Sequence, residues 1–141
     1  MLQKCAESGT AKQIKYAHCN AAAKTGTVGT KDGNSDAYCI AYTPKYTVAV
    51  RIGAKGDEPI ANEYSGGTLP AKICKIILKK LGDKSDFDTP ETIVKLDVDL
   101  TELKENQKVL LAGDDIKPEN KLGAYFSGAN IPRAYSTPRT Y

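Results

Sequence analysis

Two apolar segments in the first half of the chain have the pattern of a β-hairpin. DAYCIAYT (residues 36–43) and YTVAVRIG (residues 46–53) are rich in Tyr, Val and Ile, and only a Pro-Lys pair separates them. These residue types favour strands, and a two-residue connection suits an antiparallel pair. QIKYAHCNAAAKTGTV (residues 13–28) has enough β-branched and small residues for a third strand, and the turn sequence KDGNS follows it. The pattern predicts a three-stranded antiparallel meander.

The segment SGGTLPAKICKIILKKLGD (residues 65–83) predicts a helix. Thr68 suits the N-cap, Pro70 is tolerated in the first turn, and Gly82 suits the end. At helical spacing one face collects four large apolar residues, which predicts that this face packs on the sheet. The lysines occupy the other face or the last turn, where positive charge complements the helix dipole. The apolar residues are Ile73, Ile76, Ile77 and Leu81, and the lysines are Lys72, Lys75, Lys79 and Lys80.

The pattern changes near Pro90. TIVKLDVDL (residues 92–100) alternates in part like a strand, KVLLAG (residues 108–113) is a short apolar run, and the last fifteen residues have the pattern of irregular chain. We therefore predict two parts, with residues 1–88 forming the main α+β unit and residues 89–141 a small β-containing appendage.

Composition narrows the class of protein. The chain has 141 residues, 40% of them hydrophobic, and a net charge of +3 from 20 basic and 17 acidic residues spread along its length. This charge distribution has no basic block typical of a nucleic-acid or membrane footprint, so we expect no nucleic-acid partner. No apolar run approaches the roughly 20 residues that cross a bilayer, and the first residues lack the apolar core of a secretion signal.

The candidate metal ligands are sparse. The four cysteines are far apart, with no Cys-x-x-Cys pair and a single histidine, His18, so we expect no metal site and no cofactor. The acidic segments DVD and GDD lack the spacing of a calcium loop. Free thiols are expected, although pairing of Cys5 with Cys19 stays open, because spacing alone cannot decide it.

One ordered series of short motifs resembles a known family. Lys-Thr-Gly-Thr (residues 24–27) is followed by DAY, AYTP, a Val-rich strand and SGGTLPA, which opens the predicted helix. This series resembles the C-terminal part of the transpeptidase domain of penicillin-binding proteins, in particular the bifunctional class. The resemblance covers residues 7–82 well and the tail only loosely. Ala23 stands where the family usually has Gly, and Tyr38 where Trp is common, and neither change removes a functional group.

The resemblance implies roles for four residues. Lys24 would be catalytic, since in the family this lysine lies near the substrate carboxylate and helps to move the proton of a serine on the opposite wall. The hydroxyls of Thr25 and Thr27 would bind that carboxylate, and the Thr27 amide would form half of an oxyanion hole. Gly26 would let the substrate backbone approach closely. An exposed edge strand suits this task, because its amide and carbonyl groups can pair with an extended peptide. Without the family, the same residues read as an ordinary surface lysine and two β-forming threonines.

Two motifs of the family are missing from these 141 residues. The enzymes use a Ser-x-x-Lys motif, which holds the nucleophile, and a Ser-x-Asn motif, and no serine of this sequence fits either. We therefore expect a fragment of a D,D-transpeptidase of peptidoglycan synthesis that is inactive alone and whose parent is extracytoplasmic and membrane-anchored. Its expected partners are a stem peptide or β-lactam, the missing N-terminal part of the domain, or a second copy. The alternative is a non-catalytic module that binds cell-wall peptide or a protein.

The expected fold has a physical consequence. A single good helix covers only one face of the sheet, so apolar strand residues such as Ile40 and either Val48 or Val50 are expected to face water.

Overall fold

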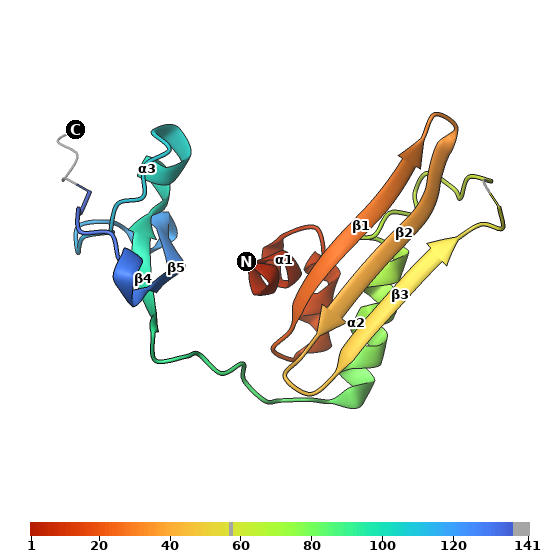
Figure 1. The fold of residues 1–141 in the computed structure, drawn as a ribbon, viewed down its shortest axis with the longest axis horizontal. Coiled ribbons are helices and arrows are strands. Elements are labelled where there is room, and N and C mark those ends of the chain that lie inside the picture. Colours follow the sequence, from red (N-terminus) through yellow and green to blue (C-terminus); the bar gives the residue numbers. More distant parts are fainter. Residues whose placement is uncertain (57, 137–141) are drawn as a thin grey trace. The chain divides into compact units, whose positions relative to one another are not determined.

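A computed structural model describes residues 1–56 and 58–136 of the protein (Figure 1). The chain forms two compact units, Met1–Phe87 and Asp88–Tyr141, and each unit is built on its own antiparallel sheet. Helices accompany both sheets, so the predicted α+β class is confirmed. The two units are described separately below.

The first unit contains the predicted meander. Its strands are β1 (Ala22–Thr30), β2 (Gly33–Tyr42) and β3 (Thr47–Gly53), which pair antiparallel in the order β1-β2-β3. The helix α2 (Leu69–Leu81) packs across β2 and β3 on one face of the sheet (Figure 1). No helix in the described residues of this unit covers the other face (Figure 1). The prediction of a three-stranded meander with one following helix is confirmed.

The chain before β1 is helical. A short helix, α1 (Leu2–Ser8), is followed by the 3₁₀-helix η1 (Lys12–Ala17), which contacts α2. The predicted strand over residues 13–28 is therefore wrong in its first part. Ile14 and Ala17 are both buried, and their three-residue separation matches the three residues per turn of a 3₁₀-helix. Burial of this face in the core outweighs the β-propensity of Ile and Tyr.

The core of the first unit is built from small side chains. Ala23, Ala37, Cys39 and Ala41 from the sheet and Ala71, Cys74 and Leu78 from α2 are all buried. Short side chains on both sides allow the helix to approach the strands closely.

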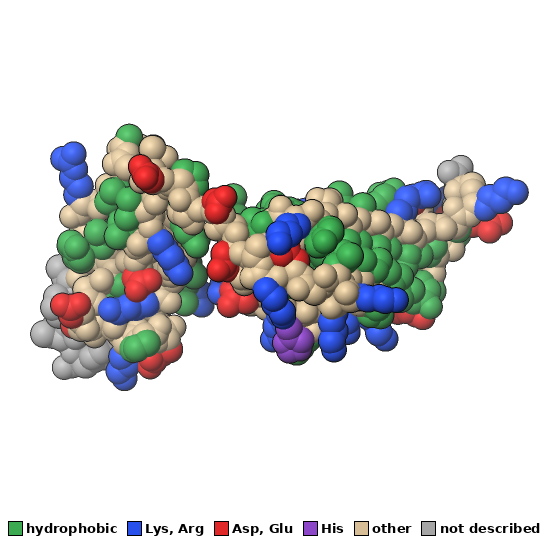
Figure 2. Space-filling view, turned by 90° about the horizontal axis from the view of Figure 1, so that it is seen from below, with side chains coloured by type: hydrophobic (Ala, Val, Ile, Leu, Met, Phe, Trp, Pro, Cys, Tyr) green, Lys and Arg blue, Asp and Glu red, His purple; other side chains and the backbone are tan. Residues whose placement is uncertain are grey.

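The face that α2 turns toward the sheet differs from the predicted one. The buried positions are Pro70, Ala71, Cys74 and Leu78. Ile76 is 54% exposed, and Ile77 and Leu81 are also exposed, although all three were expected to pack on the sheet. The lysines of α2 lie on its outer side, and Figure 2 shows lysine side chains gathered near His18. The small residues determine the packed face because only they permit close approach.

The two ends of α2 depend on specific residues. Gly82 adopts a left-handed conformation, with φ of 66°, and ends the helix as predicted. Thr68 occupies the N-cap position, but its hydroxyl does not cap the helix. It accepts a hydrogen bond from the Ser65 amide at 2.9 Å and lies 2.9 Å from the carbonyl of Glu63. Thr68 therefore stabilises the turn that leads into the helix.

The second unit has a two-stranded sheet. Strands β4 (Ile93–Asp99) and β5 (Lys121–Ser127) pair antiparallel, with α3 (Leu100–Glu105), η2 (Pro118–Asn120) and η3 (Gly128–Asn130) around them. The predicted small β-containing appendage is confirmed, including a strand within residues 92–100. The run at residues 108–113 is not a full strand, because it pairs through isolated bridges at Leu111.

The uncovered face of the main sheet exposes apolar surface, as expected. Ile40 is 49% exposed. The expectation that Val48 or Val50 also faces water is wrong, because both pair with buried residues of β2 and pack partly buried against the core. Within residues 1–56 and 58–136, no helix combines the length and apolar character needed to cross a membrane.

Candidate functional site

The motif Lys-Thr-Gly-Thr lies in β1, which is an edge strand of the main sheet. Successive side chains of a strand point to opposite faces. Thr25 pairs with Cys39, which is buried in the core, and Lys24 pairs with the exposed Ile40. Lys24 therefore lies on the open face of the sheet, and Thr25 lies on the face that carries the helices.

Lys24 is exposed, and its ammonium group bends back onto its own strand. Nζ donates a hydrogen bond to the carbonyl oxygen of Thr25 at 2.5 Å. This contact holds the charge against the backbone of β1.

Thr25 and Thr27 both have partners inside the unit. The hydroxyl of Thr25 lies 2.7 Å from that of Thr10, which in turn lies 3.4 Å from the sulfur of Cys5. Thr27 Oγ1 accepts a hydrogen bond from the amide of Gly66 at 3.0 Å. The two hydroxyls are thus tied to the segment after α1 and to the loop before α2. These bonds fix the position of the motif strand.

Gly66 makes the closest approach to the motif. A Cβ atom at this position would lie 2.6 Å from the carbonyl oxygen of Gly26 and 2.9 Å from its amide nitrogen. Real Cβ atoms do not come this close to backbone atoms, so only glycine fits here. By contrast, a Cβ on Gly26 would make an ordinary contact, 3.8 Å from the Cβ of Tyr38. The open face above Gly26 therefore has room for a ligand or a side chain.

The four site residues predicted from the sequence are contiguous, but their positions alternate between the two faces of the sheet. Lys24 and Gly26 share the open face, whereas Thr25 and Thr27 face the helix layer and bond within it. The exposed part of the strand comprises Lys24 and Thr27–Thr30. Helix α1 contacts β1 and lies beside the outer side of its first half in Figure 1. The open stretch of the edge therefore begins near Thr27.

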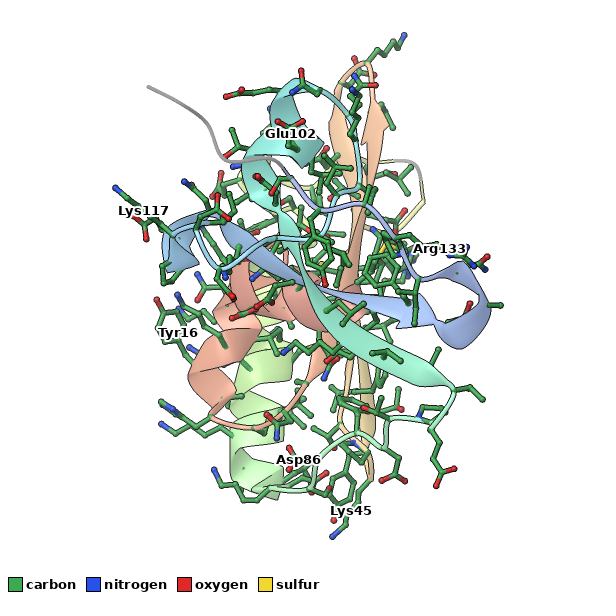
Figure 3. All side chains as sticks on the ribbon, turned by 90° about the vertical axis from the view of Figure 1, so that its left-hand side faces the viewer. Tyr16, Lys45, Asp86, Glu102, Lys117 and Arg133 are labelled. Carbon is green, nitrogen blue, oxygen red and sulfur yellow. The ribbon has the colours of Figure 1, made fainter. Side chains whose placement is uncertain are left out.

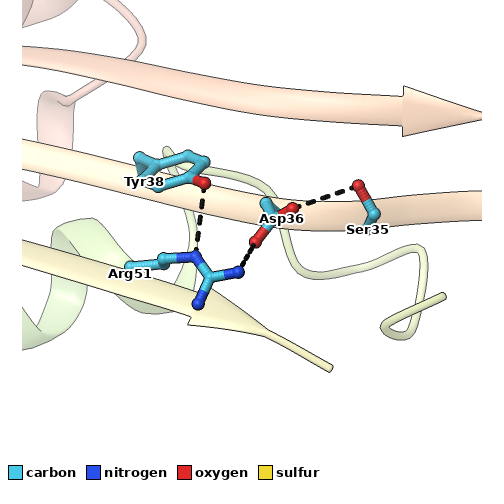
Figure 4. Close-up of polar contacts among 4 residues, drawn as sticks. All are labelled: Ser35, Asp36, Tyr38 and Arg51. Atoms are coloured by element: carbon cyan, nitrogen blue, oxygen red, sulfur yellow. Dashed lines mark hydrogen bonds and ion pairs between the residues drawn. The ribbon is translucent and has the colours of Figure 1, made fainter. Parts of the chain in front are cut away.

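A polar cluster on the open face was not singled out from the sequence. Arg51 Nε donates to the hydroxyl of Tyr38 at 3.3 Å, and Arg51 also pairs with Asp36 at 2.6 Å (Figure 4). Ser35 donates to the same carboxylate at 3.2 Å. The bond to Tyr38 and the pairing with Asp36 raise the pKa of Arg51, so its charge is permanent. Tyr38 pairs across the sheet with Gly26, so the cluster adjoins the motif strand.

The register that forms this cluster could have been inferred from the sequence. The amide of Thr43 donates to the carbonyl of Tyr46 at 2.8 Å across the two-residue Pro-Lys connection. Continuing this antiparallel register along the hairpin brings Tyr38 opposite Arg51, which is the observed pairing. The supporting contacts from Thr10 and Gly66 had no comparable signal, because they depend on tertiary packing.

The cysteines form no metal centre in the described part of the chain, where no three metal-ligating side chains cluster. All four are free thiols, and Cys39 and Cys74 are buried. Cys74 donates to the carbonyl of Cys39 at 3.4 Å. Hydrogen bonding to Cys74 and burial raise the pKa of the Cys39 thiol, so it stays protonated and serves as a small apolar side chain.

Comparison with known proteins shows what the chain is similar to. No family model matches the chain. The whole chain is similar to penicillin-binding protein 1A/1B of Bacillus subtilis, with 29% identity over 157 aligned residues, which are 16% of that relative. It also matches penicillin-binding protein 1F of the same organism, with 34% identity over 69% of this chain and 14% of the relative.

A solved structure agrees with these relatives. The penicillin-binding protein PonA1 from Mycobacterium tuberculosis matches 63% of this chain with 30% sequence identity and a TM-score of 0.52, over 25% of its own chain. The resemblance to part of a penicillin-binding protein is therefore confirmed in sequence and in fold. The chain spans about a sixth of the curated relatives or less.

Proposed function

We propose that this chain forms one wall of the substrate cleft of a penicillin-binding D,D-transpeptidase of peptidoglycan synthesis. The observation that carries the proposal is the position of Lys24 on an exposed edge strand, within a chain that is similar to penicillin-binding proteins. Its ligand would be the D-alanyl end of a stem peptide, or a β-lactam. By the same resemblance, the parent protein would act outside the cytoplasm at the membrane.

The chemistry follows from the edge of β1. An extended peptide would add to the strand at Thr27–Thr30, where its backbone can pair with the exposed main chain. Lys24 would attract the terminal carboxylate, and its bond to the Thr25 carbonyl keeps the ammonium at the edge. Thr25 and Thr27 would act first as positioning residues through Thr10 and Gly66. Direct contact of their hydroxyls with the carboxylate would require these internal bonds to be shared or exchanged.

Carboxylate binding by Lys24 can be tested by titrating the 141-residue chain with an acyl-D-Ala-D-Ala peptide and following amide shifts by NMR. A hydrogen bond to a charged group contributes about 1.5–3 kcal/mol, so Lys24→Ala should weaken binding about 10- to 100-fold. Lys31→Ala is the matched control, since it removes the same charge from the exposed turn after β1 and should change binding less than about twofold. Equal losses in both variants, or no binding by the native chain, would refute the role of Lys24.

Acylation provides a second test. None of the six serines in these 141 residues lies in a Ser-x-x-Lys motif. Loss of such a nucleophile reduces catalysis on the order of a million-fold. We therefore expect that a fluorescent penicillin does not label the purified chain covalently, as judged by denaturing gel. A labelled band that survives denaturation would show that another residue serves as the nucleophile.

A second candidate is a non-catalytic module that binds cell-wall peptide or a protein partner. The exposed Ile40 on the uncovered sheet face favours it, because apolar surface of this kind commonly binds a partner. The NMR titration separates the candidates. Shifts confined to β1 support the transpeptidase wall. Shifts centred on Ile40 and on Ala49, its partner in β3, with no dependence on Lys24, support the module.

A further inference from the structure

The sequence predicts four lysines on the outer side of α2 or in its last turn, and the structure brings the lysines of η1 beside them. The two elements contact each other, and Lys84, just after α2, donates to the carbonyl of His18, just after η1, at 2.5 Å. Figure 2 shows lysine side chains gathered around His18 on this side. We call this surface the basic face. Its charged members are Lys12, Lys15, Lys72, Lys75, Lys79, Lys80 and Lys84.

Acidic residues are absent from both elements. The sequence has no Asp or Glu between Glu7 and Asp32, or between Glu63 and Asp83. In the part of the chain that the structure describes, the ion pairs are Lys4–Glu7 and Arg51–Asp36, and neither includes a lysine of the basic face. The nearest acids after α2 are Asp83, which bonds to Ser85, and Asp86, which accepts a hydrogen bond from Asn20. Neither forms an ion pair with a lysine of the basic face in the described part of the chain, and two carboxylates against seven lysines leave this surface with a net positive charge.

Exposed apolar side chains stand among these lysines. On α2, Ile76 lies opposite the buried Cys74 and Leu78, because each residue advances about 100° around the helix. Ile77 is also exposed, at the flank of the helix. From η1, Tyr16 is 52% exposed and points away from the sheet in Figure 3. The basic face thus combines cations with side chains that prefer to leave water.

We propose that the basic face binds the surface of an anionic lipid bilayer. Lysines attract the phosphate groups of acidic lipids, and apolar or aromatic side chains between them insert at the headgroup boundary. The exposed Ile76 and Tyr16 would have no use on a purely electrostatic phosphate-binding surface, where aliphatic side chains gain little. The mixture of charge and apolar groups therefore favours a bilayer over a nucleic acid or another soluble polyanion. This proposal does not depend on the role of Lys24.

The test uses co-sedimentation of the full 141-residue chain with vesicles. We expect binding to vesicles of phosphatidylglycerol mixed with phosphatidylcholine, and none to vesicles of phosphatidylcholine alone. The quadruple variant Lys72→Gln, Lys75→Gln, Lys79→Gln, Lys80→Gln should bind at least about a hundredfold more weakly. The matched control Lys104→Gln, Lys108→Gln, Lys117→Gln, Lys121→Gln removes the same charge from the second unit and should bind within about threefold of the native chain.

Two further measurements distinguish binding to a bilayer from binding to a soluble polyanion. Ile76→Ser with Tyr16→Ser should weaken vesicle binding about tenfold while leaving the far-ultraviolet circular dichroism unchanged, because both side chains are more than half exposed. A short anionic glycerol-phosphate polymer should compete weakly. Equal loss in the two quadruple variants, binding unaffected by the Ser variants, or full displacement by the soluble polymer would each overturn the proposal of a bilayer surface.

Discussion

The two units of the chain differ in how much apolar surface their small sheets bury. The first unit encloses ten buried core residues between its sheet and the helical layer. In the described part of the second unit, the buried hydrophobic side chains are Val98 and Leu111. Charge differs too, since residues 1–87 contain thirteen basic and eight acidic residues, whereas residues 88–141 contain seven and nine. A layered apolar core stabilises the first unit, which carries the motif. Polar contacts contribute a larger share of the stability of the second unit.

This contrast predicts that the units lose structure separately. Local opening requires less free energy where few apolar contacts are buried. The second unit should therefore exchange its amide hydrogens faster than β2 and α2 of the first unit. The following substitutions test the difference, beginning with the one of largest effect.

The core of the first unit should be the most sensitive region. Leu78 is 1% exposed, and Leu78→Ala should lower the free energy of unfolding by about 2–5 kcal/mol, because it leaves a cavity under the sheet. Urea denaturation gives the size, and hydrogen exchange should show no change in β4 and β5. Ile76→Ala on the outer side of the same helix is the control, with an expected effect of less than about 0.5 kcal/mol. Similar losses from both variants would contradict the observed packed face of α2.

The second unit should respond to loss of a polar contact. Asp99 caps α3, where its carboxylate accepts hydrogen bonds from the amides of Thr101 at 2.8 Å and Glu102 at 3.2 Å. Asp99→Ala should cost about 0.5–2 kcal/mol, read as faster hydrogen exchange in residues 100–105. Asp97→Ala, at an exposed position of β4, should leave exchange in α3 nearly unchanged. Faster exchange in α2 with Asp99→Ala would show that the units are coupled.

Acid should affect the first unit through Asp83. Hydrogen bonds from the hydroxyl and amide of Ser85 lower the pKa of this carboxyl. A lowered folded-state pKa contributes stability that is fully present above the unfolded value of about 3.9 and is lost as the pH falls below it. The melting temperatures of the native chain and Asp83→Asn should therefore differ at pH 7 and converge toward pH 2. A difference that grows on acidification would have the wrong sign for this contact.

Local pattern predicted most elements because the apolar segments of β2, β3 and α2 are long and strongly patterned. The helical stretch before β1 was missed, since Ile14 and Tyr16 favour strands locally and only packing in the core makes the segment helical. The packed face of α2 was predicted wrongly because large apolar side chains were expected inside, whereas the sheet presents alanines and requires Ala71 and Cys74 opposite them. Which side chains of a helix are buried depends on the surface that it packs against, and the sequence of the helix alone does not specify that surface.

The motif in β1 was predicted from the order of short motifs along the chain. The residues that contact it could not be predicted from the sequence. Lys24 through Thr27 lie in a strand that the sequence indicates, but the bonds from Thr10 and Gly66 join positions 15 and 39 residues apart. Contacts between positions so far apart produce no periodic pattern in the sequence, so they could not be predicted from it.

The contact between Gly66 and Gly26 connects the loop before α2 to the strand β1 that carries the motif. The Gly66 amide bonds to Thr27, and a Cβ atom at Gly66 would lie 2.6 Å from the carbonyl oxygen of Gly26, so a displacement of β1 should also shift the loop that leads into α2. A fluorescent label at Lys72, an exposed position near the start of α2, would therefore report ligand binding at the edge of the sheet from a residue that the ligand does not contact.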